Sequence, residues 1–217
     1  LILTAIAIIN IIAFILIWLL EANNPHTLGA MSTGEQALNA WFQATVPRSS
    51  GFNTIDTGAI EHSTALLTML LMFIGGGSLS TAGGIKVGTF VILLLSVISF
   101  LRRNEEIRIF NHSVSPETTY KALAVASITG MLVFTGCFII FLLEPNLDPI
   151  DLMFEVVSAA CTVGLSRGVT GELHDGSLFV LSLLMFTGRL GPLTLAYLIA
   201  TPKKSRLKHA NANIQIG

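Results

Sequence analysis

The chain has 217 residues, of which 52% are apolar and only 12% are charged, and its formal net charge is −1. Soluble domains usually carry about 25% charged residues, so this chain has too few polar side chains to cover a water-facing surface. Together with a mean hydropathy of +0.74, the composition predicts a membrane protein and offers no basic face for nucleic acid.

The first apolar segment, residues 1–20, contains no charged residue and is long enough to cross a hydrocarbon core of about 30 Å. It starts at Leu1 without the charged segment or cleavage site of a signal peptide, so we expect the chain to begin inside a longer protein. Residues 35–46 then predict a helix that is too short to cross, and Pro47 and Gly51 end it.

The next apolar stretch, residues 62–100, is interrupted by a glycine-rich segment at 75–84. As one helix it would be about 58 Å long, nearly twice the membrane thickness. Glycine and serine disfavour a helix interior, so we predict two helical pieces joined by a loop at membrane depth. The loop either narrows a pore or is a packing break that lets helices approach closely. It is not a nucleotide-binding loop, because the lysine spacing differs and no strand precedes it.

A similar order of segments follows in the second half. After a polar connector at 102–120, the pattern predicts a span at 121–143, a short helix at 148–160 and a span at 176–200. The turn glycines Gly51 and Gly164 lie 113 residues apart (164 − 51). We therefore predict an all-α membrane protein with two helix–pore helix–helix repeats, although two similar units could also arise by chance. The expected domains are 1–101, the connector 102–120, 121–201 and a basic tail at 202–217.

The basic residues predict the orientation. Eight of the twelve Lys and Arg residues lie in the connector as far as Lys121 and in the tail, whereas the two segments 21–35 and 144–151 carry acids only. The positive-inside rule places the connector and the tail in the cytoplasm, so both short helices enter the membrane from outside.

Such helices direct the partial negative charge of their C-terminal ends at the bilayer centre, which favours a cation there. A following glycine lets carbonyl oxygens turn toward the ion without a side-chain clash. The alternative is that the two turns merely end two interfacial helices. The candidate filter residues are Ser49, Ser50, Gly51, Phe52, Thr162, Val163, Gly164 and Leu165.

Lys86 and Arg189 lie inside the predicted spans, where an unpartnered charge is costly. They either act on a permeation path, as a barrier or a gate anchor, or form structural ion pairs and snorkel. The candidate gate residues are Gly75, Gly76, Gly77, Ser78, Ser80, Thr81, Gly83, Gly84, Lys86 and Arg189.

The sequence offers no catalytic residue and no metal cluster. Glu155 is isolated by spacing, the five histidines are scattered, and Cys137 and Cys161 lie in apolar stretches without ligand spacing. An intramembrane enzyme therefore lacks support. A non-transporting scaffold would leave the broken helices and the intramembrane arginine unexplained.

Four segments, in this order, resemble the Trk/Ktr/HKT superfamily of potassium transporters: Arg48–Asp56, Gly75–Lys86, Thr162–Ser166 and Gly188–Pro192. The resemblance covers essentially the whole chain. It implies four repeats in a pseudo-fourfold arrangement around one ion path, with this chain as the third and fourth. By the same resemblance Gly51 and Gly164 are filter glycines, the segment 75–84 is an intramembrane gating loop, and Arg189 faces that loop.

The resemblance also implies potassium uptake through a carbonyl-lined filter, with K⁺ as the transported ion, Na⁺ as a coupling ion and no bound cofactor. It implies a homodimer in the cell membrane, with one pore per subunit, on a cytosolic nucleotide-binding regulatory subunit. Two filter turns cannot surround an ion, so we expect the two N-terminal repeats to be missing from this chain. A two-repeat protein that dimerises into one pore is the alternative.

Overall fold

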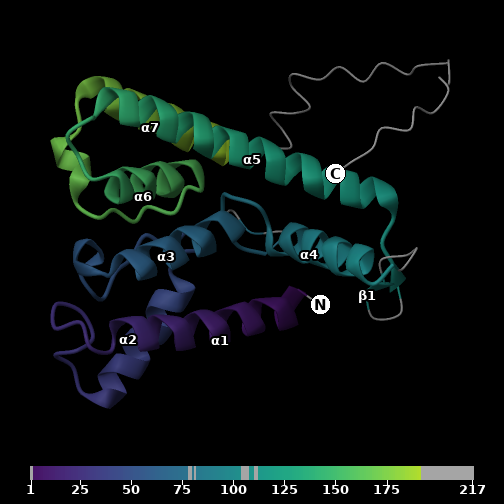
Figure 1. Cartoon of the computed structure of the whole chain (residues 1–217), viewed down its shortest axis with the longest axis horizontal. Coiled ribbons are helices and arrows are strands. Elements are labelled where there is room, and N and C mark those ends of the chain that lie inside the picture. The colour runs from purple at the N-terminus through teal and green to yellow at the C-terminus, as the bar shows by residue number, and fades with distance from the viewer. Residues whose placement is uncertain (1, 78–79, 81, 104–107, 110–111, 192–217) are drawn as a thin grey trace.

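The structure, a computed structural model, describes residues 2–77, 80, 82–103, 108–109 and 112–191 (Figure 1). Helices dominate these residues, as predicted: α1 Ile2–Glu21, α2 Thr33–Thr45, α3 His62–Ile74, α4 Val87–Leu101, α5 Pro116–Leu143, α6 Pro149–Ala160 and α7 Asp175–Leu190. Two short 3₁₀ turns, η1 Thr57–Ala59 and η2 Val169–Glu172, lie between helices. The connector holds a small antiparallel hairpin of β1 Arg108–Ile109 and β2 His112–Ser113, which the sequence analysis did not predict.

Local sequence signals explain where two of the helices begin. Ser115 precedes Pro116 at the start of α5, and Asp148 precedes Pro149 at the start of α6. Proline fits the first helical position because it needs no N–H partner there. The Asp148 carboxylate accepts the Ile150 N–H at 2.8 Å, which caps α6.

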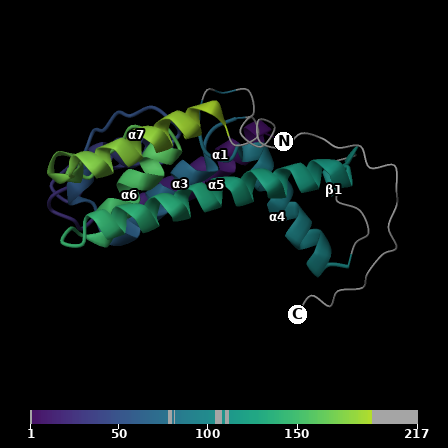
Figure 2. The same ribbon diagram turned by 90° about the horizontal axis from the view of Figure 1, so that it is seen from above.

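The predicted interruption of the third span is present but slightly longer than expected. Helix α3 ends at Ile74 and α4 begins at Val87, so the connection covers 75–86 rather than 75–84. In Figure 1 the two helices run nearly in line, and the view from above shows α4 turning away from α5 (Figure 2). Helix α7 ends at Leu190, and residues 192–200 of the predicted last span lie outside the described part of the chain.

Helix α6 is the central element of the fold. It packs against α3 on one side and against α5 and α7 on the other, whereas α1 packs against α2, α3 and α4. One face of α6 contributes Phe154 and Val157 to a core shared with α1, α2 and α3. Its opposite face contributes Leu152 and Val156 to a core shared with α5 and α7. A short helix that is buried on both faces is typical of an element inside a bundle.

The outside of the bundle is apolar. Large side chains such as Phe134 and Phe138 on α5 and Phe179 on α7 are more than half exposed. Helices α1 and α5 are long and apolar enough to cross a membrane. An apolar exterior around a polar interior break is the arrangement expected in lipid rather than in water.

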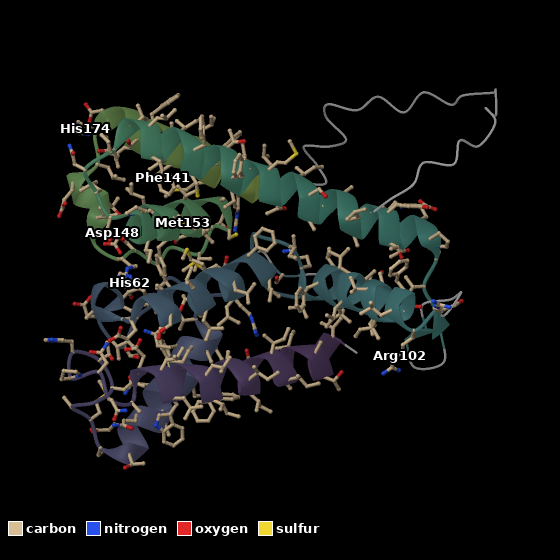
Figure 3. The ribbon with its side chains drawn as sticks, viewed as in Figure 1. His62, Arg102, Phe141, Asp148, Met153 and His174 are labelled. Carbon is tan, nitrogen blue, oxygen red and sulfur yellow. The ribbon has the colours of Figure 1, made fainter. Side chains whose placement is uncertain are left out.

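Polar residues gather at the two ends of the bundle. His62, Asp148 and His174 lie together at one end, and Arg102 lies at the other (Figure 3). The two short helices α2 and α6 lie in the half that contains the first of these ends (Figure 1).

Candidate functional site: two glycine turns beside a broken helix

The two turns that follow α2 and α6 lie against each other. A Cβ atom on Gly51 would lie 3.3 Å from the Val163 carbonyl oxygen, and one on Gly164 would lie 3.4 Å from the Gly51 Cα atom. The Ser49 hydroxyl donates a hydrogen bond to the Thr162 carbonyl at 2.8 Å. The fold therefore brings together two segments that lie 113 residues apart in the chain.

Both turns adopt backbone conformations that favour glycine. Gly51 has φ of 68° and Gly164 has φ of 89°. In each turn a non-glycine residue two positions earlier also has positive φ, at 70° for Ser49 and 53° for Thr162. Such a backbone points successive carbonyl groups in unusual directions, which is the property that a carbonyl-lined ion site requires.

The second turn grows directly from the end of α6. The Thr162 N–H donates to the Ala159 carbonyl at 3.0 Å, and the Val163 N–H donates to the Ser158 carbonyl at 2.9 Å. Of the flanking candidates, Val163 and Leu165 are buried, while Phe52 on the first turn is 70% exposed and Ser50 is also exposed. The two sets of candidate filter residues thus meet, but their side chains differ in environment.

The connection between α3 and α4 is folded back on itself. The Ile85 N–H donates to the Phe73 carbonyl at 2.9 Å, and the Val87 N–H donates to the Gly76 carbonyl at 3.0 Å. Gly75 and Gly84 have φ of 63° and 71°. The positive-φ glycines let the chain turn back and enter α4 beside the end of α3.

This connection also contacts the second turn. A Cβ atom on Gly83 would lie 2.7 Å from the Thr162 hydroxyl oxygen, so any side chain there would displace the turn. That hydroxyl oxygen is buried and has no hydrogen-bond partner among the described residues. Gly76, Gly77 and Ser80 lie in the same connection, whereas the candidate gate residues Ser78 and Thr81 lie outside the described residues.

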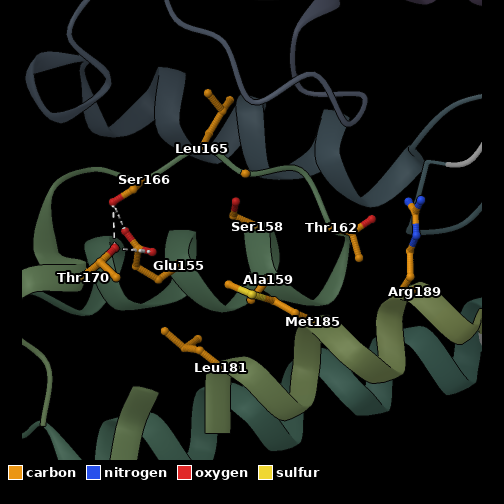
Figure 4. Close-up of a pocket in the computed structure, with 11 residues that line it drawn as sticks. Glu155, Ser158, Ala159, Thr162, Leu165, Ser166, Thr170, Leu181, Met185 and Arg189 are labelled. Carbon is orange, nitrogen blue, oxygen red and sulfur yellow. Dashed lines mark hydrogen bonds between the residues drawn. The ribbon is translucent and has the colours of Figure 1, made fainter. Parts of the chain in front are cut away.

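Lys86 and Arg189 approach the connection from different helices. The Lys86 ammonium, just before α4, donates to the Ser80 carbonyl at 2.9 Å and to the Ala82 carbonyl. Arg189, in the last turn of α7, points toward the same connection (Figure 4), and its charge acts on Lys86. The two cations thus lie at the same connection, which Lys86 is part of and Arg189 faces.

A cavity of about 460 Å³ adjoins the second turn between α6 and α7 (Figure 4). Its wall includes Glu155, Thr162, Gly164, Met185 and Arg189. The cavity therefore extends from Glu155 to Arg189.

Glu155 is a site residue that the sequence interpretation dismissed as isolated. Its carboxylate accepts the Ser166 hydroxyl and, at 2.9 Å, the Thr170 hydroxyl (Figure 4). Ser166 directly follows the second turn, so α6 holds the turn at both its beginning and its end. The partners lie 11 and 15 residues away, which no helical spacing rule would reveal.

Two further carboxylates were predicted only as polar ends of spans. Glu21, at the end of α1, is fully buried and accepts the Glu61 N–H at 2.9 Å. Glu144, after the end of α5, is 3% exposed and accepts the His174 N–H at 2.8 Å. Glu61 and His174 are the residues that cap α3 and α7, so each carboxylate satisfies an N–H at a helix start.

Hydrogen bonds also lower the pKa of Glu144, which lies beyond the end of its helix. The Ser177 hydroxyl, and after it the His174 N–H, hold the pKa of the Glu144 carboxyl below its ordinary value. The His174 ring is largely exposed, but its Nδ1 atom contacts the Glu144 carboxylate at 2.8 Å.

The described residues contain no group of three His, Cys, Asp or Glu side chains that could hold a metal ion. Cys137 and Cys161 are free thiols.

Comparison with known proteins identifies the family. The family described as TrkH, cation transport protein, matches residues 1–208. Two proteins named Ktr system potassium uptake protein B are similar to this chain. The protein of Vibrio alginolyticus is 38% identical over 99% of this chain and 47% of its own length. The protein of Bacillus subtilis (strain 168) is 39% identical over 100% of this chain and 48% of its own length. The chain thus spans about half the length of these curated relatives.

The fold has a known counterpart as well. The crystal structure of the potassium transporter TrkH from Vibrio parahaemolyticus matches with a TM-score of 0.77 and 22% identity, over 91% of this chain and 43% of that one. The fold is therefore that of a membrane transporter, and the predicted resemblance at the level of the family is confirmed. This chain belongs to the TrkH family of cation transport proteins, a family of transporters and not of enzymes.

Proposed function

We propose that this chain is the C-terminal half of a potassium-translocating subunit, in which K⁺ passes a filter lined by backbone carbonyls. One observation supports the proposal most directly: the turns at Gly51 and Gly164 follow two short helices and pack against each other. The C-terminal ends of these helices carry partial negative charge, and the turns supply carbonyl oxygens in place of water around the ion. The filter residues proposed are Ser49 to Phe52 and Thr162 to Leu165.

The chain divides, in this proposal, into a third-type repeat at 1–101, a connector at 102–120, a fourth-type repeat at 121–201 and a tail at 202–217. Two turns can line only half of an ion site. Because the chain spans about half the length of its relatives, the remaining half of such a protein supplies the other two turns of a pseudo-fourfold filter.

The connection 75–86, facing Arg189, acts as the gate below the filter. Its backbone contacts Thr162, so a change in the connection reaches the filter turn directly. Irregular backbone at membrane depth persists where protein or water satisfies it, and here Lys86 and two backbone hydrogen bonds do so. A gate that is held by a few polar contacts can open without unfolding the helices around it.

The surroundings of the subunit follow from charge and from the family. The end that carries Arg102 faces the cytoplasm, and the end that carries Asp148 and His174 faces outward, as the positive-inside rule requires. The proposed partners are the N-terminal half of the same protein, a second copy in a homodimer and a cytosolic nucleotide-binding regulatory subunit. Na⁺ is the proposed coupling ion.

Rubidium uptake tests this function. The full-length protein, expressed with its regulatory partner in cells that lack their own potassium systems, should accumulate ⁸⁶Rb⁺ in a saturable way, and excess K⁺ should compete. Cells with the empty vector provide the background. Correctly inserted protein whose uptake never exceeds that background would favour a non-transporting scaffold and overturn the proposal.

A further inference from the structure

Arg167 connects the loop after the second filter turn to the loop after the first. Its side chain is only 6% exposed, and its Nε atom lies 2.5 Å from the Asp151 Oδ1 atom in the first turn of α6. Its Nη1 atom donates to the Thr57 carbonyl at 3.2 Å and to the Ile60 carbonyl at 3.0 Å. One guanidinium thus links two segments more than 100 residues apart.

The main chain at this junction is also closely packed. A Cβ atom on Gly58, within η1, would lie 2.9 Å from the Arg167 carbonyl oxygen. The Gly58 N–H in turn donates to the Asp56 carboxylate at 2.9 Å, which fixes the η1 turn. The carbonyls of Thr57 and Ile60 are therefore presented by a rigid turn and not by a loose loop.

The chemistry of this contact suits arginine and not lysine. A buried guanidinium is costly unless its N–H groups are satisfied, and here Asp151 provides the counter-charge while the two carbonyls accept from the other side. Asp151 is itself well placed, because a carboxylate in the first turn of a helix faces the positive end of the helix dipole. A lysine at 167 could bind either the Asp151 carboxylate or the carbonyls, but it lacks the planar, forked set of donors that binds both sides at once.

A second cross-contact lies before the glycines: the Ser49 hydroxyl bonds to the Thr162 carbonyl at 2.8 Å. Gly51 and Gly164 touch between this bond and the Arg167 contacts. The two proposed filter segments are therefore joined on both sides of their glycines. Binding sites need their ligands held within about 0.5 Å, and these two contacts restrain the turns on both sides of the glycines.

We propose that Arg167 is a positioning residue for ion discrimination: with Asp151 it fixes the spacing of the two filter turns from their outer side. The proposal rests on the transport function proposed above. It assigns Arg167 no contact with the ion, since its charge is already matched by Asp151 and the two carbonyls.

The test measures ⁸⁶Rb⁺ uptake by the full-length protein with its regulatory partner, as a function of Rb⁺ and of competing Na⁺. Arg167→Met should raise the apparent KM for Rb⁺ and lower the preference for Rb⁺ over Na⁺, each by roughly fivefold or more, because misplacing site ligands by an ångström has effects of that order or larger. Asp151→Asn should act in the same direction but less strongly. Glu117→Gln, which breaks an exposed ion pair with Lys121, is the matched control and should change neither value.

A charge swap separates positioning from simple ion pairing. Asp151→Arg combined with Arg167→Asp restores an ion pair but leaves the Thr57 and Ile60 carbonyls without a donor from position 167. The swap should therefore fail to restore discrimination, whereas Arg167→Lys should retain part of it. Full recovery in the swap would assign the effect to the ion pair alone and overturn the positioning role.

The outcomes distinguish this proposal from the transport function. A wild-type protein without uptake overturns both. An active wild type with unchanged KM and preference in Arg167→Met, at membrane abundance within about twofold, overturns only the positioning role. If Arg167→Met does not reach the membrane, Arg167→Lys decides, and an unchanged preference in that variant overturns the proposal.

Discussion

At the scale of single residues, the turns proposed as the filter depend on backbone conformations that cost energy. Ser49 and Thr162 have positive φ without being glycine, which typically costs about 1–3 kcal/mol for each residue. The hydrogen bond from the Ser49 hydroxyl to the Thr162 carbonyl joins these two residues and helps to hold both conformations. Strain of this kind is typical of sites where the direction of a carbonyl group matters for function.

Adding a side chain at either central glycine should disturb the ion site. Gly51→Ser places a Cβ atom 3.3 Å from the Val163 carbonyl oxygen at a φ of 68°, and Gly164→Ser faces the Gly51 Cα atom at 3.4 Å. We expect the apparent KM for Rb⁺ uptake to rise by about tenfold or the preference over Na⁺ to fall similarly, since ring geometry sets selectivity. Gly34→Ser, whose Cβ atom would meet nothing within 4 Å, is the control. Unchanged uptake kinetics in both filter variants would exclude the filter assignment.

Residue identity and spacing predicted these glycines but not their polar supports. Glycine, serine and proline favour turns through their own backbone preferences, so the sequence alone was enough to predict the turns. Glu155 and Arg167 act through partners 11 to 110 residues away, and only the fold brings those partners close. The contacts of Glu21 with the cap of α3 and of Glu144 with the cap of α7 were missed for the same reason, because the acceptor and the N–H donor belong to different segments.

At the scale of elements, residues at the ends of α1 and α5 bind the residues at the starts of α3 and α7. Glu21 binds the capping residue of α3 and Glu144 binds that of α7. A buried carboxylate satisfies its own hydrogen-bonding needs by accepting such N–H groups, so both partners gain from the contact. The element boundaries were largely predictable, whereas this way of joining them was not.

The contact at Glu144 should make stability depend on pH. Because the folded-state pKa of Glu144 is lowered, its contribution is fully present above the ordinary carboxyl pKa of about 4.3 and is lost as the pH falls through the lower folded-state value. Glu144→Gln should lower Tm in detergent at neutral pH by about 2–4 °C. The Tm of the variant should also fall less steeply than that of the wild type as the pH drops below about 4.3. Thermal unfolding of wild type and variant across this range measures both effects, with Glu172→Gln as a control, and parallel curves would contradict the assignment.

At the scale of the whole molecule, the two halves of the chain contribute different parts to one site. The first provides the broken helix, the second provides Arg189, and the filter turn at Thr162 lies against both the connection and α7. A Cβ atom on Gly188, one residue before Arg189, would lie 3.3 Å from the Thr162 Cγ2 atom. The proposed gate and filter therefore share a contact surface, so a movement of the connection changes the support of the filter.

This arrangement predicts the direction in which changes at the proposed gate alter the rate of uptake. Lys86 fastens the connection through the Ser80 and Ala82 carbonyls, and Arg189 faces it. Arg189→Ala removes a positive charge near the path, and deleting part of 77–83 removes the obstruction itself. We expect both to raise the maximal rate of Rb⁺ uptake, by roughly tenfold for the arginine, since a charge in a low-dielectric path is worth more than 1.4 kcal/mol.

Arg102→Ala provides the control, because Arg102 is an exposed cation at one end of the bundle, away from the described polar contacts of the connection. Uptake should be compared with and without the regulatory partner, because an opened gate no longer depends on that partner for its opening. The ratio of the two rates should therefore fall toward one in the gate variants and stay unchanged in Arg102→Ala. If Arg189→Ala and the deletion both reach the membrane with reduced or unaltered flux, the broken segment and its arginine are supports of the fold and not a gate.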